Sequence, residues 1–258
     1  MAAKKKANAK QPGKRPARRT TSTQSDPAAR RKKPAKEVAP AKRARPSSAE
    51  ARKASTIARL RKEKVPVLRS LPRVEDEAEA KVPGQDAVVD RAIALFAVAA
   101  KGAHAPPEFL QSFAREFDLL PKLSRKERAF FKLPKPPTRQ LMTFSWRWEA
   151  LVVLLWALGF VPKLGRPEKL ADVQKLVAIV RGRGPQRFRG EARLRPTKAL
   201  LDFSDLMYRY HWAVRDAELN GRPAPARLNP DLVMEWDHAA RWLVGYGGQN
   251  WDDITLDT

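Results

Sequence analysis

Apolar residues recur at spacings of three and four along residues 86–102, which is the period of an amphipathic α-helix. The residues on this apolar face are Val89, Ile93, Phe96 and Ala100. Gly102 follows the last of them, and glycine commonly ends a helix. The pattern therefore predicts a helix from Asp86 to Gly102 that turns one face toward a core.

Two shorter helices are predicted next, and each has its own start signal. Prolines at positions 106 and 107 open the first, whose apolar side consists of Phe109, Leu110, Phe113 and Phe117. Ser124 and Glu127 are spaced as a capping box, in which each side chain accepts a hydrogen bond from a backbone amide at the start of a helix. A short helix after Ser124 is therefore expected, ended by the prolines at positions 134, 136 and 137.

The longest apolar run, residues 150–161, lies toward the end of a predicted central helix, residues 138–158, that Gly159 closes. A transmembrane helix needs about 20 apolar residues, so this run predicts a buried helix instead. Another helix is expected from Pro167 to Gly182. Its apolar side consists of Leu170, Val173, Leu176, Val177 and Val180.

Residues 181–198 carry seven basic residues against Glu191 alone and are punctuated by glycine, which predicts a loop, with or without a short strand. A long helix is expected from Pro196 to Asn220. Asn229 followed by Pro230 is a strong start signal for a last helix, which runs to about Gly245.

Residues 49–258 are predicted to form a single multi-helix globular domain of the all-α class. A surface helix is expected near its start, over residues 49–64, and an acidic linker follows it. All tryptophan, tyrosine and phenylalanine residues lie beyond residue 90, which fits a segment with a hydrophobic core. No alternation of strands and helices and no series of hairpins is present in the pattern.

Residues 1–48 differ sharply from the rest: sixteen Lys and Arg stand against two acidic residues, which gives +14 of the total charge of +24. A segment so charged and without aromatic residues is expected to be a disordered basic arm. We expect it to neutralise nucleic-acid phosphates without reading sequence. The residues assigned to this contact are Lys4, Lys5, Lys6, Lys14, Arg15, Arg18, Arg19, Arg31, Lys32, Lys33, Lys42, Arg43 and Arg45.

Cysteine is absent, and no apolar stretch of signal-peptide length follows the basic N-terminus. We therefore expect a cytoplasmic protein. The arm has no apolar anchors of the kind that a membrane-surface helix uses, so no membrane partner is expected.

Two of the predicted helices carry polar residues that could form a site. Asp202, Asp205, Arg209 and Asp216 recur along one side of the helix at 196–220, and the last helix has Glu235 and His238 three residues apart. An ion-pair network that fastens the helices is the favoured interpretation. The complete candidate cluster is Arg147, Glu149, Asp202, Asp205, Arg209, His211, Asp216, Glu235, His238, Asp252 and Asp253.

A metal site is the alternative interpretation of the same residues. Glu235 and His238 have the spacing of a di-iron ligand pair, but neither His104 nor His211 has a glutamate three residues before it. A mononuclear site drawn from the cluster stays open. No metal is assigned, and the sequence leaves the cofactors unknown. Neither a phosphate loop nor an activated nucleophile is visible, so the catalytic residues are also left unknown.

Four segments together resemble one known family. They are WRWEALVVLLWALG, LDFSDLMYRYHWAVRDAELNG, VMEWDHAARWL and WDDITLDT, and residues 51–72 resemble the opening of the same family. This is the bacterial family catalogued as domain of unknown function 4272, and the likeness covers about residues 50–258. It implies no established activity. Similar proteins are expected to have Glu-Arg-His where this chain has Glu235, Trp236 and Asp237, with His238 one position later.

The arm is similar in composition to the Lys-, Ala- and Pro-rich arms of bacterial histone-like proteins. The leading hypothesis is a non-enzymatic helical protein whose arm binds nucleic acid nonspecifically. One alternative is a metal-dependent hydrolase or ligand-binding enzyme that uses the Asp/Glu/His cluster. The other is a protein-interaction or immunity-like protein.

Overall fold

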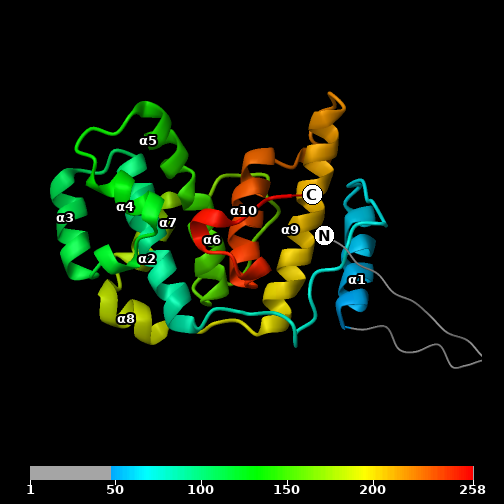
Figure 1. Cartoon of the computed structure of the whole chain (residues 1–258), viewed down its shortest axis with the longest axis horizontal. Helices are drawn as coiled ribbons and strands as arrows, with labels where there is room; N and C mark the ends of the chain where they lie inside the picture. The colour runs from blue at the N-terminus through cyan, green and yellow to red at the C-terminus, as the bar shows by residue number, and fades with distance from the viewer. Residues whose placement is uncertain (1–47, 258) are drawn as a thin grey trace, which may run out of the picture. The chain divides into compact units, whose positions relative to one another are not determined.

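The computed structural model describes residues 48–257, and these residues contain helices and no strand (Figure 1). The α-helices are α1 (Ser48–Lys62), α2 (Gln85–Gly102), α3 (Pro107–Glu116), α4 (Arg125–Lys132), α5 (Thr138–Ser145), α6 (Arg147–Ala157), α7 (Val173–Val180), α8 (Gly184–Glu191), α9 (Thr197–Leu219) and α10 (Pro230–Leu243). Short 3₁₀ turns lie at Leu120–Lys122, Pro225–Arg227, Tyr246–Gly248 and Trp251–Asp253. The predicted all-α class is confirmed for this part of the chain.

The core is built by five helices, each packed against the next, that form a row across the described domain. α9 packs against α10, α10 against α6, α6 against α2, and α2 against α5. Residues 92–100 of α2 are buried on every side of the helix, because α2 has α5 and α6 beside it and α3 and α4 over it. One continuous cluster of buried apolar residues joins these helices, which is the arrangement expected of a single hydrophobic core.

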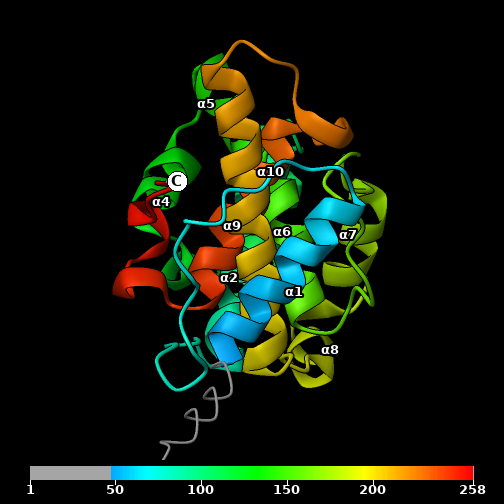
Figure 2. The same ribbon diagram turned by 90° about the vertical axis from the view of Figure 1, so that its right-hand side faces the viewer.

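The remaining helices cover this row from outside. α1 lies along α9, as two perpendicular views show (Figures 1 and 2), whereas α3 and α4 pack against α2 at the opposite end of the described domain. α7 contacts α6, and α8 contacts α7. Within residues 48–257 no helix is long and apolar enough to cross a membrane.

Several predicted helix starts are confirmed with their capping hydrogen bonds. Ser124 accepts from the amide of Glu127, and the Glu127 side chain accepts from the amide of Ser124, which completes the predicted capping box. Asn229 accepts from the amides of Asp231 and Leu232 at the start of α10. These local signals placed α4 and α10 correctly.

The predicted continuous helix over residues 138–158 is wrong, because the chain turns at Trp146 and forms α5 and α6 instead. Its two halves pack on different partners. α6 lies between α2 and α10, whereas α5 crosses the end of α2 so closely that a Cβ added to Gly102 would overlap the Ser145 backbone. The tertiary contacts of α5 therefore override the helical periodicity of the sequence.

The helix predicted from Pro167 begins later, at Val173, with Asp172 as its cap. Backbone groups in the preceding segment are used by distant residues: the Pro167 carbonyl accepts from Asn229, and the Ala171 amide donates to Glu149, both at 2.8 Å. These bonds hold residues 167–171 outside the helix.

The loop predicted over residues 181–198 is also wrong, since it contains α8. Phe188 is fully buried there, and its ring stacks on Phe160 with the centroids 4.9 Å apart. The burial of Phe188 holds α8 against the core, in a segment whose glycines and arginines had favoured a loop. The predicted basic arm, residues 1–48, lies outside the described residues except for Ser48.

Candidate functional site

Three residues of the predicted polar cluster line one cleft, which we call the α4–α10 cleft. Arg147, His238 and Asp252 lie on its walls, and its volume is about 490 Å³. The remaining lining residues are Lys126, Glu127, Ala129, Phe130, Leu133, Gln140, Thr143, Phe144 and Trp251. The cleft thus combines aromatic rings with a few polar groups, which is the usual make-up of a small-ligand pocket.

Arg147 and Glu235 form the ion pair at this cleft. The Arg147 Nη1 atom donates to both carboxylate oxygens of Glu235, at 2.8 and 2.7 Å, while the buried Arg147 Nε has no partner among the described residues. Burial raises the pKa of Glu235, and the charge of Arg147 opposes that rise. Because the carboxylate is already occupied by the guanidinium, it is not placed as a metal ligand.

His238 has a well-defined protonation state. Its Nε2 atom lies 3.0 Å from the carbonyl oxygen of Trp251, so Nε2 carries the proton and Nδ1 keeps its lone pair. Burial lowers the pKa of His238 to about 4, with a further lowering by Arg147. The imidazole is therefore neutral near pH 7, and it holds the C-terminal segment to α10.

Asp252 fastens the same C-terminal segment to α4. It accepts from the Ser124 hydroxyl at 2.7 Å and from the Lys126 amide at 2.9 Å. A carboxylate at this place stabilises a helix N-terminus. Asp253 is exposed and lines a neighbouring hollow beside Arg125. The acidic C-terminal motif thus has a structural role through Asp252.

Three of the candidate residues of α9, Asp205, Arg209 and His211, are buried and lie at two separate places. Asp205 and Arg209 form a buried ion pair within α9, at 2.8 Å. The Nδ1 atom of His211 lies 2.9 Å from a carboxylate oxygen of Asp237, and the same oxygen accepts from Arg241 Nε at 3.0 Å. Asp237 and Arg241 are both buried, and Arg241 also donates to the carbonyls of Thr255 and Asp257 in the C-terminal segment.

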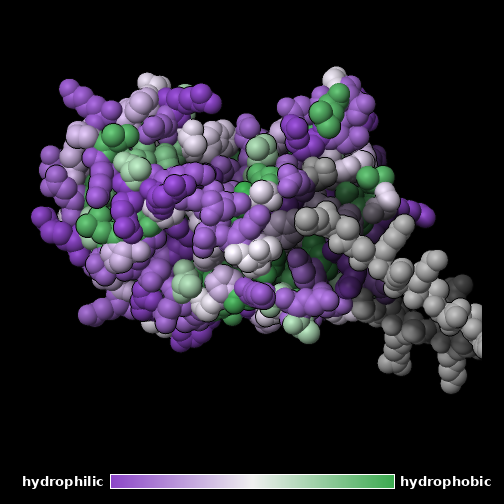
Figure 3. All heavy atoms as spheres, viewed as in Figure 1, coloured by the Kyte–Doolittle hydropathy of each residue, from purple (hydrophilic) through white to green (hydrophobic). Residues whose placement is uncertain are grey.

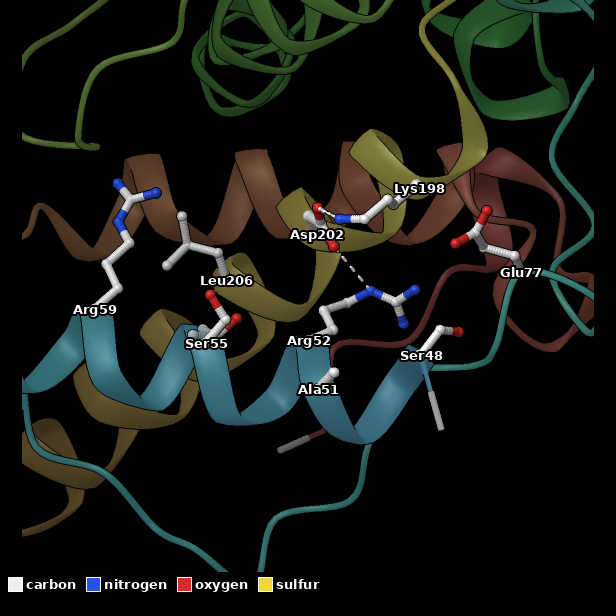
Figure 4. Close-up of a pocket in the computed structure, with 10 residues that line it drawn as sticks. Ser48, Ala51, Arg52, Ser55, Arg59, Glu77, Lys198, Asp202 and Leu206 are labelled. Atoms are coloured by element: carbon white, nitrogen blue, oxygen red, sulfur yellow. Dashed lines mark hydrogen bonds and ion pairs between the residues drawn. The ribbon is translucent and has the colours of Figure 1, made fainter. Parts of the chain in front are cut away.

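Asp202 lies in a different cleft, between α1 and α9, shown in Figure 4. Its carboxylate is bracketed by Arg52 at 3.1 Å and Lys198 at 2.7 Å. Asp216, farther along α9, pairs with Arg222. Neither aspartate meets His238, which lines the α4–α10 cleft.

Glu149 is a buried carboxylate with a packing role. It accepts from the Ala171 amide at 2.8 Å and from the Trp236 indole at 3.4 Å. Burial is the main reason that the pKa of Glu149 is raised. Within residues 48–257, no group of three His, Asp or Glu side chains is placed to hold a metal ion.

The arginine side chains of residues 181–198 bind partners within the described domain, although several of them are exposed. Four of them form salt bridges with carboxylates: Arg181 pairs with Glu116, Arg183 and Arg187 pair with Glu191, and Arg189 pairs with Asp86 and Asp90. Arg193 and Arg195 donate to backbone carbonyls instead. Together with Lys198, which pairs with Asp202, all seven basic residues of this segment have internal partners.

A second basic segment, which the sequence reasoning passed over, has the opposite character. Six exposed cations lie on α4, α5 and the turn between them, and none of them forms a salt bridge within the described part of the chain. We call them the basic face: Arg125, Lys126, Arg128, Lys132, Lys135 and Arg139. These basic residues are apparent in the sequence RKERAFFKLPKPPTR, where they alternate with the apolar residues and prolines that set the ends of the helix.

Residues 48–257 form an all-helical domain with buried ion pairs, a mixed aromatic and polar cleft, and the basic face of α4 and α5. The chain belongs to the family described as Domain of unknown function (DUF4272), whose model matches residues 52–254. Comparison with curated proteins and with solved structures gives no match.

Proposed function

We propose that this protein binds nucleic acid nonspecifically, and that the N-terminal segment, residues 1–48, supplies the main contact with phosphates. One observation carries the proposal: the segment has sixteen basic residues, two acidic residues and no aromatic residue. Such a segment gains its affinity by releasing counterions from the phosphate backbone, and it cannot read or stack on bases.

The partners of the arginines in residues 181–198 support this assignment. Because carboxylates and backbone carbonyls engage that segment, its high charge is not the main source of attraction for an external polyanion. The carboxylates of the predicted enzyme cluster are likewise occupied by arginine or by backbone amides. The metal-dependent hydrolase therefore gains no support from the arrangement of these residues.

A salt titration of duplex DNA binding tests the proposal. The full chain is compared with an arm-neutral variant, in which the thirteen arm residues assigned above are changed to Gln. We expect the affinity of the unmodified protein to fall steeply with salt, at a slope of about −0.9 per phosphate contacted. The arm-neutral variant is expected to bind at least about tenfold more weakly, with a shallower slope. Equal affinities and slopes would remove the arm from the function.

Two measurements keep the other hypotheses in view. Elemental analysis of the purified protein that found a stoichiometric metal would favour the enzyme. A stoichiometric protein partner that is retained after nuclease treatment would favour the interaction or immunity-like role.

A further inference from the structure

We propose that the basic face of α4 and α5 is a second contact surface for the phosphate backbone of nucleic acid. This inference rests on the proposed function and extends it from the arm to the folded domain. The face concentrates six exposed cations within residues 125–139. The single acidic residue in this range, Glu127, is buried and bound to Arg91, so it does not offset their charge outward.

The scaffold under these cations is held at both ends of α4. Asp252 and the capping box fix its first turn. At the other end, the Lys101 ammonium donates to the carbonyls of Phe130, Phe131 and Leu133, at 2.7 to 3.1 Å. A cationic surface on a fixed helix loses less entropy on binding than a flexible one does, so fewer contacts suffice for measurable affinity.

The chemistry of the face favours nucleic acid over an anionic membrane. A membrane-surface helix needs a continuous apolar side that enters the lipid. Here Phe130 is buried and Phe131 half-buried against the core, and Leu133 and Met142 are the large apolar residues left exposed along α4 and α5. In the space-filling view, apolar patches at this end of the domain are small and lie among hydrophilic residues (Figure 3).

The position of the face adds a second argument. α1 begins at Ser48, where the N-terminal segment joins the domain, and α4 and α5 lie at the opposite end of the domain (Figure 1). The point of attachment and the basic face are therefore far apart. Two linked sites of this kind bind one long polyanion more tightly than either site alone, because the second contact is intramolecular.

Charge-neutral variants of the full chain separate the two contacts. The face-neutral variant changes Arg125, Arg128, Lys132, Lys135 and Arg139 to Gln, and keeps Lys126 because its side chain donates to the Asp252 carbonyl. A matched control removes five exposed cations that form no salt bridge elsewhere in the described domain. These are Lys62, Arg69, Lys81, Lys163 and Lys169.

Each variant is titrated with salt against a 30-base-pair duplex, both alone and combined with the arm-neutral changes. We expect the face-neutral changes to lower affinity about tenfold or more and to reduce the salt slope by about 2, whereas the control changes the slope by less than about 1. In the arm-neutral background, the face-neutral changes should abolish the remaining salt-dependent binding. Thermal unfolding of every variant confirms that the domain stays folded.

The outcomes distinguish this inference from the proposed function. If the arm-neutral variant binds DNA as tightly as the unmodified protein but the face-neutral variant binds more weakly, the proposed role of the arm is overturned and that of the basic face is supported. If the face-neutral variant binds as its control does but the arm-neutral variant binds more weakly, the proposed role of the basic face is overturned and that of the arm is supported. Loss of binding to phosphatidylglycerol vesicles, with DNA binding unchanged, would assign the face to a membrane and overturn the inference.

Discussion

Two segments of this chain have nearly the same density of basic residues and opposite surroundings. The segment at 181–198 contains α8 and the residues on either side of it, and acidic residues of α2 and α3 form salt bridges with its arginines. The basic face on α4 and α5 has exposed cations and no salt bridges among the described residues. Charge counted along a sequence therefore does not measure charge available to a partner, because only the fold decides which cations are already paired.

The first prediction tests the segment that holds α4, which carries the basic face. Acid should destabilise the domain there, because His238 binds the Trp251 carbonyl next to Asp252. The pKa of His238 lies at about 4 in the folded chain and at about 6.5 when exposed, so the unfolded chain takes up a proton that the folded chain does not. Protonation of His238 in the unfolded chain should not affect the free energy of unfolding above pH 6.5. As the pH falls from 6.5 toward 4, this proton uptake should lower the free energy of unfolding by about 3 kcal/mol.

Urea unfolding at pH 7 and at pH 4.5 measures this loss. Because carboxylates also titrate there, the useful quantity is the difference between the unmodified chain and His238→Gln. We expect the two curves of stability against pH to converge as the pH falls. Parallel curves would show that His238 is not linked to unfolding.

The second prediction concerns the most deeply engaged arginine of the paired segment. Arg195 donates to the carbonyls of Trp156 and Pro162 at 2.7 and 2.9 Å, and its guanidinium lies 4.9 Å from the centre of the Trp156 ring. Arg195→Gln should cost about 2 kcal/mol of unfolding free energy, because carbonyls lose charged donors. Urea unfolding measures it, and Arg195→Lys should restore only part. If Arg195→Gln were as stable as the unmodified chain, the hydrogen bonds of Arg195 to the Trp156 and Pro162 carbonyls would not contribute to stability.

A smaller effect is expected for a paired but exposed arginine. Arg189 bridges Asp86 and Asp90, and all three side chains are partly open to water. Arg189→Gln should lower stability by about 1 kcal/mol or less at low salt, and the difference should shrink in 0.5 M NaCl, because salt screens exposed pairs. Thermal unfolding at both salt concentrations checks this. A loss that does not depend on salt would mean that packing, not charge, is involved.

The smallest effect on stability is expected on the basic face. Lys135→Gln should change the free energy of unfolding by less than about 0.5 kcal/mol, since the side chain is exposed and forms no ion pair with the described residues. The salt slope of DNA binding by this variant should nevertheless fall, by up to about 1, as part of the decrease of about 2 expected for the face-neutral variant. Finding the reverse, a stability loss with an unchanged slope, would place Lys135 in the paired class.

Helix starts with local chemistry were predictable from the sequence. Ser124 with Glu127 and Asn229 with Pro230 satisfy backbone amides within a few residues, so no distant contact is needed to define them. The turn at Trp146 was not predictable, because it depends on where α5 meets Gly102 of α2. Helical periodicity describes one face of a segment and says nothing about two halves that pack on different partners.

The sequence indicated polar residues of interest but not how the fold arranges them. The sequence indicated that Arg147, Glu235 and His238 were of interest, and the first two are paired beside the α4–α10 cleft that His238 lines. It could not show that Asp202 belongs to another cleft with Arg52, since those residues are 150 positions apart. Long-range pairing of this kind depends on the packing of α1 on α9.

The hold of Asp252 on α4 also has a consequence for biosynthesis. Its partner Ser124 is made 128 residues earlier. While the chain emerges from the ribosome, α4 is synthesised well before the carboxylate that binds its first turn. The helix that carries the basic face therefore gains this contact only after the 128 residues that follow Ser124 have been added.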